Sequence, residues 1–464
     1  MKKFSSLFIA LWVALLGVSA YAAETTPARP PIPAKPAFQA GNAPQIAWQK
    51  FLGGKENEHL SAFHALSGGG FILLAYSDPA GDKSLVKNWG VKIDDRGNIV
   101  GEKWAAETVD SFFTSIDPSS DGGYLLAGSF LSDYGVDKGS LDIRVAKLNS
   151  KGERLWEKFL GGSERDFLLS LSATPDGGAL ILGEVFSTDG LAEGNASPGD
   201  LWLLKLSGGG EVQGQIFLKN QSAYFIDAAK AVMDGDIFKI PADTRYPKGL
   251  KAYGQKVAAA ARQLCAVLEP HKTDLLIEHL DLVIAPDNRR GYFFSFASWT
   301  KNPEKTGGRT LQTWAARLNS EFKPLLQKPL RAGDRYLIWA LSPAPDGGFL
   351  ASGTVSRRGK WIHLEDQPEN PHRGIFLKFN QALEPVGYKV PLSQNQGEFF
   401  GLLPLPGGKY LVAGEGSPRL EPSRSKVWIL GVDASKEGGS SNHNPKPSKE
   451  DKSPAGTGPR EYKP

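Results

Sequence analysis

A unit of 53 to 60 residues recurs along the chain and limits what it can fold into more than any other feature. Its marker is a glycine turn between two apolar stretches, found near Gly69, Gly122, Gly177, Gly235, Gly291, Gly347 and Gly407. The flanking stretches alternate apolar and small residues, as in YLLAGSF and ALILGEVF. Glycine supplies the positive φ that tight hairpins need. Repeats of this length indicate one β-rich unit used several times in a stack or a ring.

Seven such units predict an all-β fold, a seven-bladed β-propeller with four-stranded blades, because a closed ring leaves no long exposed strand edge. The alternative, a solenoid, usually carries atypical capping repeats at its ends, and none is visible here. The fourth unit is the weakest. Its residues 255–271 have helix propensity and end near Pro270, yet Ala-Ala-Arg-Gln-Leu resembles the Trp314-Ala-Ala-Arg-Leu of the next unit. Repeat context favours a degenerate strand pair over a short helix.

The phrase WQKFLGG at Trp48 returns as WEKFLGG at Trp156 and reads as a fourth, outer strand with its link to the next blade. The first copy has no blade before it, and the last unit ends after its third strand at Asp433. We therefore expect the N-terminal strand to complete the last blade and to close the ring. One domain would then span residues 45–434.

The two ends of the sequence predict export. Lys2 and Lys3 precede an apolar run, and Ala20-Tyr21-Ala22 matches a cleavage site, so residues 1–22 are read as a signal peptide rather than a membrane anchor. No later segment approaches the roughly 20 apolar residues that cross a bilayer. Residues 23–44 form a Pro-rich linker, and residues 435–464 lack periodic hydrophobic positions, which predicts a disordered tail. We expect a periplasmic or secreted protein without a transmembrane segment after cleavage.

The patterns W-x-K-x-x-G-G, D-G-G-Y/F-L-L-A-G and D-x-W-x-x-K-L resemble those of exported bacterial β-propeller-repeat proteins, which are often labelled bulb-type-lectin-like. The match covers nearly the whole predicted domain and is sharpest in the second and third units. This resemblance implies a propeller fold. The mannose-site pattern of true bulb lectins, Q-x-D-x-N-x-V-x-Y, does not occur, so the resemblance does not extend to a sugar site.

The sequence carries no recognised catalytic or metal motif. Its seven histidines form no closely spaced pair, and neither a G-x-S-x-G elbow nor a P-loop is present. The segment Asp133 to Asp137 lacks the ligand spacing of a calcium loop. Cys265 is the single cysteine, which excludes an intramolecular disulfide, and its apolar neighbours predict a buried side chain. We expect neither cofactor nor metal.

Three acidic residues, Glu58, Asp110 and Asp166, take similar places after three outer strands. They would either bring carboxylates to the mouth of the ring or cap the turns between blades. Short acidic side chains commonly bond turn amides, so the capping role is favoured.

The long loops between second and third strands share one predicted face, and loops held by a rigid scaffold commonly carry function. The second and third units place acids there: Asp133, Asp137, Asp142, Asp189, Glu193 and Asp200. The residues predicted to bind a partner are Trp299, Arg357, Arg358, Lys360, Trp361, His363, Arg373, Arg419 and Arg424. Charges on solvated loops are common by default. Opposite charges on one rim also orient a partner during encounter.

These features predict an exported, non-catalytic, monomeric propeller that binds an envelope protein or a surface polysaccharide through its long-loop face. Nucleic acid is excluded as the main partner, because the net charge is only +4 and the basic residues are scattered. The alternative is a hydrolase or lyase with carboxylates at the central channel. It requires two acidic groups within about 5–10 Å of each other.

Overall fold

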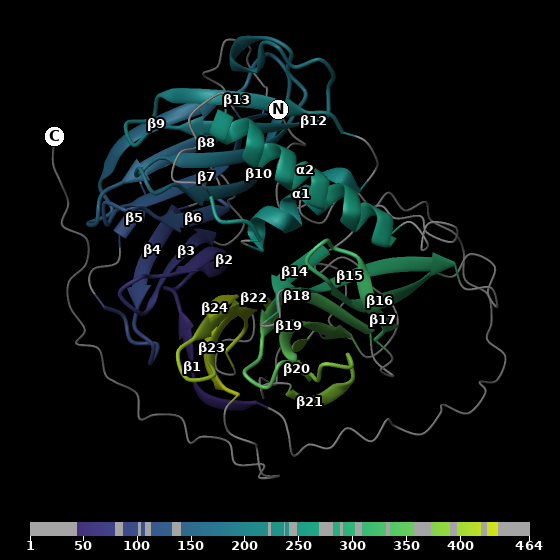
Figure 1. Cartoon of the computed structure of the whole chain (residues 1–464). Coiled ribbons are helices and arrows are strands. Elements are labelled where there is room, and N and C mark those ends of the chain that lie inside the picture. The colour runs from purple at the N-terminus through teal and green to yellow at the C-terminus, as the bar shows by residue number, and fades with distance from the viewer. Residues whose placement is uncertain are drawn as a thin grey trace, which may run out of the picture.

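The computed structural model describes residues 44–78, 87–100, 104–106, 113–131, 141–220, 224–235, 237–240, 248–268, 282–287, 291–301, 309–330, 335–356, 373–389, 397–418 and 425–434. Within these ranges the chain forms six four-stranded antiparallel sheets and two α-helices (Figure 1). The predicted signal peptide, most of the predicted linker and the predicted tail lie outside them. No helix in the described ranges is both long enough and apolar enough to cross a membrane.

Five of the sheets take their strands in chain order. Their strands are β2 (Asn57–Ala65), β3 (Phe71–Asp78), β4 (Lys87–Ile93) and β5 (Trp104–Ala106); β6 (Ser115–Pro118), β7 (Tyr124–Leu131), β8 (Leu141–Leu148) and β9 (Arg154–Leu160); β10 (Asp166–Ala173), β11 (Ala179–Val185), β12 (Asp200–Leu206) and β13 (Val212–Leu218); β14 (Leu282–Pro286), β15 (Tyr292–Lys301), β16 (Arg309–Leu318) and β17 (Pro324–Pro329); and β18 (Arg335–Pro343), β19 (Phe349–Ser356), β20 (Arg373–Phe379) and β21 (Pro385–Lys389). Figure 1 shows the first strand of each sheet toward the middle of a ring and the last toward its outside.

The sixth sheet joins the two ends of the described chain. Its order is β1 (Gln45–Leu52), β24 (Lys426–Asp433), β23 (Lys409–Gly416) and β22 (Gly397–Leu405). Strand β1 pairs with β24 from Gln45 opposite Asp433 to Leu52 opposite Val427. The Lys426 ammonium also donates to the carbonyl oxygens of Gly54 and Glu56, at 2.7 and 2.8 Å. The prediction that the N-terminal strand completes the last sheet is confirmed.

The prediction of seven blades is corrected, because the fourth unit is helical. Two helices, α1 (Phe225–Asp234) and α2 (Lys248–Leu268), follow β13, so the strand pair expected at 255–271 is wrong. Gly235 ends α1 and does not turn a hairpin. In α2 the buried residues recur at helical spacing, at Leu250, Tyr253, Val257, Ala261, Leu264 and Leu268. This periodicity and the high helix propensity of alanine outweigh the likeness to the neighbouring repeat.

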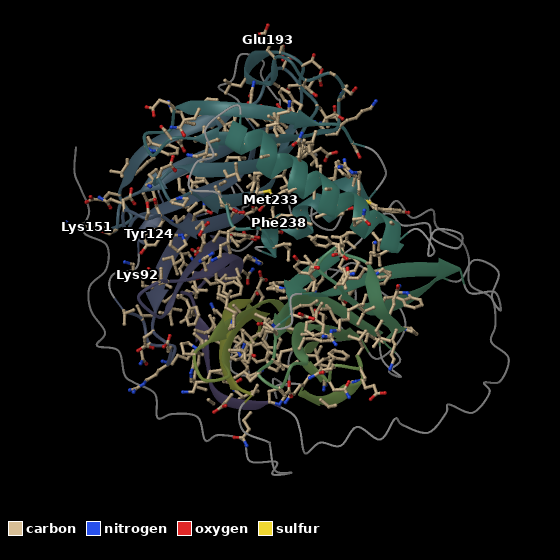
Figure 2. The ribbon with its side chains drawn as sticks, viewed as in Figure 1. Lys92, Tyr124, Lys151, Glu193, Met233 and Phe238 are labelled. Carbon is tan, nitrogen blue, oxygen red and sulfur yellow. The ribbon has the colours of Figure 1, made fainter. Side chains whose placement is uncertain are left out.

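The helices lie between two sheets, where a further sheet was expected (Figure 1). Helix α1 contacts β10 and β14, and α2 contacts β12 and β13. Met233 and Phe238 belong to the apolar cluster that joins the helices to the sheet starting at β14, and the ring of Phe238 lies 6.1 Å from that of Phe322 (Figure 2). Between sheets the core is likewise apolar. One cluster combines Ile143 of β8 with Leu204 of β12.

The repeated W-x-K phrase links each outer strand to the following sheet. Trp48 of β1 packs against Gly97, where a Cβ atom would lie 2.5 Å from the indole ring. Trp156 of β9 occupies the same place beside Gly210 and donates its indole N–H to the carbonyl oxygen of Gly208. Both glycines have positive φ, so glycine meets a backbone requirement and a packing requirement together. The repeated phrase therefore marks the same tryptophan–glycine contact at two junctions between sheets.

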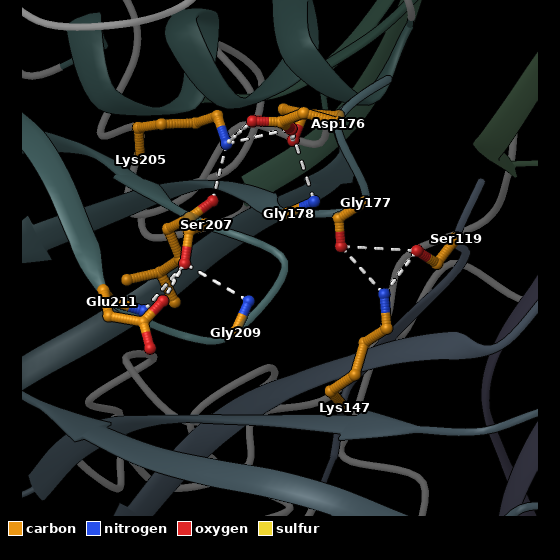
Figure 3. Close-up of polar contacts among 11 residues, drawn as sticks. Ser119, Lys147, Asp176, Gly177, Gly178, Lys205, Ser207, Gly209 and Glu211 are labelled. Carbon is orange, nitrogen blue, oxygen red and sulfur yellow. Dashed lines mark hydrogen bonds and ion pairs between the residues drawn. The ribbon is translucent and has the colours of Figure 1, made fainter. Parts of the chain in front are cut away.

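Basic side chains of the third strands form hydrogen bonds and ion pairs with the glycine turns. Lys205 of β12 is fully buried and donates to Asp176, and Lys147 of β8 donates to the carbonyl oxygen of Gly177 in the next sheet (Figure 3). Further pairs of the same kind join Lys147 to Asp121, Arg317 to Asp287 and Lys378 to Asp346. Lys92 reaches across sheets to lie over the ring of Tyr124 (Figure 2). Each cation thus has a partner at this end of the sheets.

A candidate acid–base site where the ring closes

Most of the predicted partner-binding residues lie outside the described ranges. Arg357, Arg358, Lys360, Trp361, His363, Arg419 and Arg424 are among them. Trp299 does not lie in a loop, because β15 continues to Lys301 and pairs Trp299 with Leu311 of β16. Arg373 is half-buried at the start of β20, opposite Val355. The described residues therefore do not assemble the predicted basic arc.

The described acids of the predicted acidic arc differ in their surroundings. Asp189 accepts a hydrogen bond from the Ser163 amide, and Asp200 accepts one from the Asn220 amide. Asp142 is buried. Of this group, Glu193 is exposed at the edge of the molecule (Figure 2). Asp133 and Asp137 lie outside the described ranges.

The acidic residues that follow the outer strands were predicted to cap the turns between sheets. This prediction is confirmed for the two that the structure describes. Asp166 accepts hydrogen bonds from the amides of Gly162, Phe186 and Ser187. Glu58 accepts them from the Gly54 amide, the Ser77 hydroxyl and the Trp89 indole. Asp110 lies outside the described residues. Glu58 and Asp166 are buried structural groups.

A different set of titratable residues gathers at the seam, which we define as the junction between the first sheet (β2–β5) and the last sheet (β1, β22–β24). The seam residues are His59 of β2, Tyr76 and Asp78 of β3, Glu398 of β22 and Glu415 of β23. His59 and Tyr76 are directly opposed in one sheet, as are Glu398 and Glu415 in the other. All except Asp78 are half-buried.

Glu415 is held in place across the seam by the first sheet. Its Oε1 accepts a hydrogen bond from the Leu60 amide at 3.0 Å, and its Oε2 lies 3.0 Å from His59 Nδ1. The pairing register of β2 shifts between Leu60 and Ala62, which is a β-bulge. A bulge leaves a local gap in the ladder, and here the Leu60 amide bonds the neighbouring sheet. At the junction between the second and third sheets, the hydroxyl of Ser129 accepts a hydrogen bond from the equivalent amide, that of Leu168.

Glu398 has the more unusual environment of the two carboxyl groups. Residues directly opposed in an antiparallel pair have Cβ atoms about 4.5–5.5 Å apart on one face of the sheet. Burial, and then the negative charge of Glu415, raise the pKa of Glu398 to about 8. Both effects disfavour the ionised form. At neutral pH Glu398 is thus mainly protonated and able to donate a proton.

His59 and Tyr76 form the opposite side of the seam. Their rings stack with centroids 4.7 Å apart. Burial by itself lowers the pKa of His59, but the hydrogen bond and charge of Glu415, with the charges of Asp78 and Glu58, outweigh burial and raise it. Burial, followed by the charges of Glu415 and Asp78, also raises the pKa of Tyr76, so its phenol keeps its proton.

A second acidic pair occupies the equivalent repeat position at the helical unit. Glu184, like Glu415, follows the glycine near the end of the second strand of its sheet. Burial and the charge of Asp227 in α1 raise the pKa of Glu184 to about 7, and burial raises the pKa of Asp227 to about 6. The residue opposite Glu184 is Phe167, whereas the residue opposite Glu415 is Glu398. Within the described sheets, two directly opposed glutamates occur at this position only in the seam.

Sequence reasoning missed Glu398 and Glu415 because attention went to the long loops. A signal was nonetheless present: the strands ALILGEV and KYLVAGEG place a glutamate after the same glycine. Comparing the first strands in the same register would have placed Glu398 opposite Glu415. What the sequence does not state is that His59, more than 350 residues away, contacts Glu415.

No family model matches the chain, and no curated protein matches it. Similar solved structures include the α-L-arabinanase of Penicillium chrysogenum complexed with arabinobiose, 12% identical over 86% of this chain and 99% of that one, with a TM-score of 0.36. The haemagglutinin-neuraminidase of parainfluenza virus 5 is 8% identical over 85% and 96%, with a TM-score of 0.35. A Bacteroides vulgatus member of the DUF4221 family is 10% identical over 86% and 100%, with a TM-score of 0.35.

The prediction of a non-catalytic, partner-binding protein is corrected by this comparison. The similar structures are mostly enzymes, among them also a mannose phosphorylase, a β-1,3-galactosidase and a polysaccharide lyase. Likenesses at this level do not transfer an activity, so the reaction has to be argued from the seam residues themselves.

Proposed function

We propose that this chain is a hydrolase that cleaves glycosidic bonds by acid–base catalysis at the seam. The observation that carries the proposal is the pair Glu398 and Glu415, which are directly opposed on neighbouring strands while the pKa of Glu398 is raised to about 8. Glycoside hydrolysis commonly uses two carboxyl groups whose environments separate their pKa values, one acting as acid and the other as base or nucleophile.

Glu398 is assigned the role of general acid. Near neutral pH it holds a proton, and it is half-buried, so it is shielded without being closed off from solvent. As the bond between the anomeric carbon and the leaving oxygen breaks, Glu398 donates its proton to that oxygen. A positioned acid of this kind contributes about 10²–10⁴-fold to the rate.

Glu415 is assigned the role of general base. The Leu60 amide and His59 fix its orientation, and the Ser425 hydroxyl lies 3.3 Å from Oε2. Water attacks the anomeric carbon and gives one proton to Glu415, while the leaving sugar takes the proton of Glu398. One C–O bond breaks and another forms, so water is the only co-reactant. The hydrogen bonds to Glu415 hold its carboxylate in one orientation before the attacking water binds.

The substrate class follows from where the protein is proposed to act. We keep the proposal that residues 1–22 direct export, so a glycan of the envelope or the surroundings is the substrate to consider first. N-terminal sequencing of the mature protein would test export, because cleavage after Ala22 is expected. Arabino-oligosaccharides, sialylated glycans and β-1,3-galactans are suitable first substrates, since the similar structures include enzymes named for them.

The test compares three glutamine variants with the wild type in a reducing-sugar assay across this set and amino-sugar oligomers. Glu398→Gln and Glu415→Gln should each lower kcat by about 10²-fold or more, because one lacks the acid and the other the base. Glu184→Gln is the matched control, since Glu184 takes the same repeat position in another sheet and should leave kcat unchanged. The wild-type rate should fall as pH rises through about 8, when Glu398 loses its proton.

Three results would count against hydrolysis. A wild-type kcat for the Glu398→Gln variant would show that Glu398 is not the general acid. If the folded wild-type protein cleaves none of these glycans, the proposed glycoside hydrolysis is wrong. A product that carries a new carbon–carbon double bond, seen by its ultraviolet absorbance, identifies a lyase in place of a hydrolase.

A further inference from the structure

The proposed reaction assigns no role to one buried carboxylate of the seam, that of Asp78. It ends β3, on the same face of the sheet as Tyr76, because side chains two residues apart on a strand share a face. It is 9% exposed, and its charge acts on both His59 and Tyr76. Its Oδ1 accepts no hydrogen bond from any residue that the structure describes.

An unpartnered buried carboxylate oxygen is costly, because removing a charged group from water without a hydrogen bond or ion pair disfavours the folded state. Glu58 and Asp166 show how this chain satisfies structural acids: Glu58 accepts three hydrogen bonds and Asp166 accepts four. Among the described residues, Asp78 Oδ1 has no such partner. A group retained under that cost is a candidate for contact with a ligand.

The charge of the seam indicates which kind of ligand. The carboxyl groups of Asp78 and Glu415 both act electrostatically on His59. Glu398 carries a proton near neutral pH, and His59 is the one basic side chain among the five seam residues. His59 is already engaged with Glu415. In the described ranges, no three His, Cys, Asp or Glu side chains are arranged to hold a metal ion. The unmet charge of Asp78 therefore calls for a cationic group on an organic ligand.

We propose that the seam selects a glycan with free amino groups, and that the ammonium of one amino sugar pairs with Asp78 beside the Glu398–Glu415 pair. This inference rests on the proposed function and names the substrate class for the same site. An ammonium supplies both the positive charge and the hydrogen-bond donors that Asp78 lacks. An N-acetylated sugar has neither, because its amide nitrogen is neutral and carries a single N–H.

The test measures binding, separately from turnover, by calorimetry with glucosamine oligomers and with N-acetylglucosamine oligomers of equal length. In the Glu398→Gln background, which prevents cleavage, the glucosamine oligomer should bind at least about tenfold more tightly, as expected for a desolvated charge pair. Adding Asp78→Asn should remove that preference. Asp142→Asn is the matched control, because Asp142 is another buried aspartate whose Oδ1 has no hydrogen-bond partner among the described residues, and it lies outside the seam.

Equal affinity for the two oligomers would overturn the inference, as would a preference that survives Asp78→Asn. If Asp78→Asn does not fold, Asp78→Glu is used in its place. This variant keeps the negative charge and should keep the preference for the glucosamine oligomer. The two proposals fail separately. Cleavage that depends on Glu398 but prefers neutral glycans removes only the amino-sugar inference. Asp78-dependent binding of glucosamine oligomers, together with cleavage that survives Glu398→Gln, removes only the assigned acid.

Discussion

The turn ends of the sheets and the seam use buried charge in opposite ways. At the turn ends, Lys205 is fully buried and bonds both carboxylate oxygens of Asp176 (Figure 3). Burial alone would raise the pKa of Asp176, but Thr174 and Lys205 outweigh it and lower it. At the seam, acid faces acid, and the pKa of Glu398 rises to about 8.

The difference separates residues that stabilise the fold from residues available for chemistry. In three of the described sheets a Lys–Asp pair supports the turn that precedes the second strand, and in a fourth an Arg–Asp pair does so. An opposed glutamate pair works against the fold whenever both groups are ionised. Such a pair is retained at a cost to stability, and perturbed pKa values of this kind are concentrated at functional sites.

Removing β1 should break the seam and leave the turn ends in place. A chain without residues 45–54 loses the strand paired with β24, and with it the Gly54 amide that bonds Glu58. The melting temperature should fall by on the order of 10 °C or more, because several kcal/mol of pairing and packing are lost. Differential scanning calorimetry measures this, with a chain that begins at residue 44 as the control.

Hydrogen exchange on the same deletion sharpens the comparison. The Leu60 amide, which bonds Glu415 across the seam, should exchange much faster, while the Gly178 amide at a turn end keeps its protection. An unchanged melt, or equal loss of protection at both places, would show that β1 does not close the ring in the way described.

Lys205→Met tests the turn end. The variant keeps most of the side-chain volume but leaves Asp176 and the Leu206 carbonyl without the ammonium. Breaking a fully buried pair costs roughly 3–5 kcal/mol, and because Asp176 is 41% exposed we expect a loss of about 2–3 kcal/mol. Urea unfolding measures it. Lys158→Met, at an exposed lysine, should change stability by less than about 0.5 kcal/mol. The catalytic assay should give wild-type kcat for both.

Glu398→Gln should have the opposite effect on stability, and only at higher pH. The pKa of Glu398 is about 8 in the folded chain and near its ordinary value of 4.5 in the unfolded chain. The folded state therefore binds the extra proton between these pH values, and stability is lost as pH rises through them. Glutamine is always neutral. The variant should match the wild type at pH 4 and exceed it by about 2 kcal/mol at pH 9, after allowance for partial solvation.

The matched variant at the helical unit, Glu184→Gln, should show the same sign with a smaller gain that is complete near pH 8, because the pKa of Glu184 is about 7. Urea unfolding at pH 4, 7 and 9 compares the two. If Glu398→Gln shows no gain at pH 9, Glu398 is not held protonated and the proposed acid loses its basis.

The sequence predicted the sheets well wherever the repeat was intact. Trp48 and Trp156 marked outer strands, and the unpaired copy at Trp48 led to the correct closure with β24. The fourth unit was misassigned because repeat register was given more weight than local propensity. The buried face of α2, from Leu250 to Leu268, has helical spacing that a strand pair would not bury.

The candidate site was harder to predict from the sequence than the sheets were. Trp299 was predicted to lie at the start of a long loop, but pairing with Leu311 extends β15 past it. Glu398 is ordinary in the sequence. Only the register of β22 against β23, together with burial, makes it an acid with a raised pKa.

The sequence thus sufficed for the repeated β-unit, its glycine turns and the closing role of the N-terminal strand. These depend on local patterning and on residues that recur at fixed spacing. The tertiary structure alone decided that a helical pair replaces one unit and that residues 59 and 415 meet. The physical reason is that a pKa, a seam and an unpartnered carboxylate arise from burial and from contacts between distant segments, which no local pattern encodes.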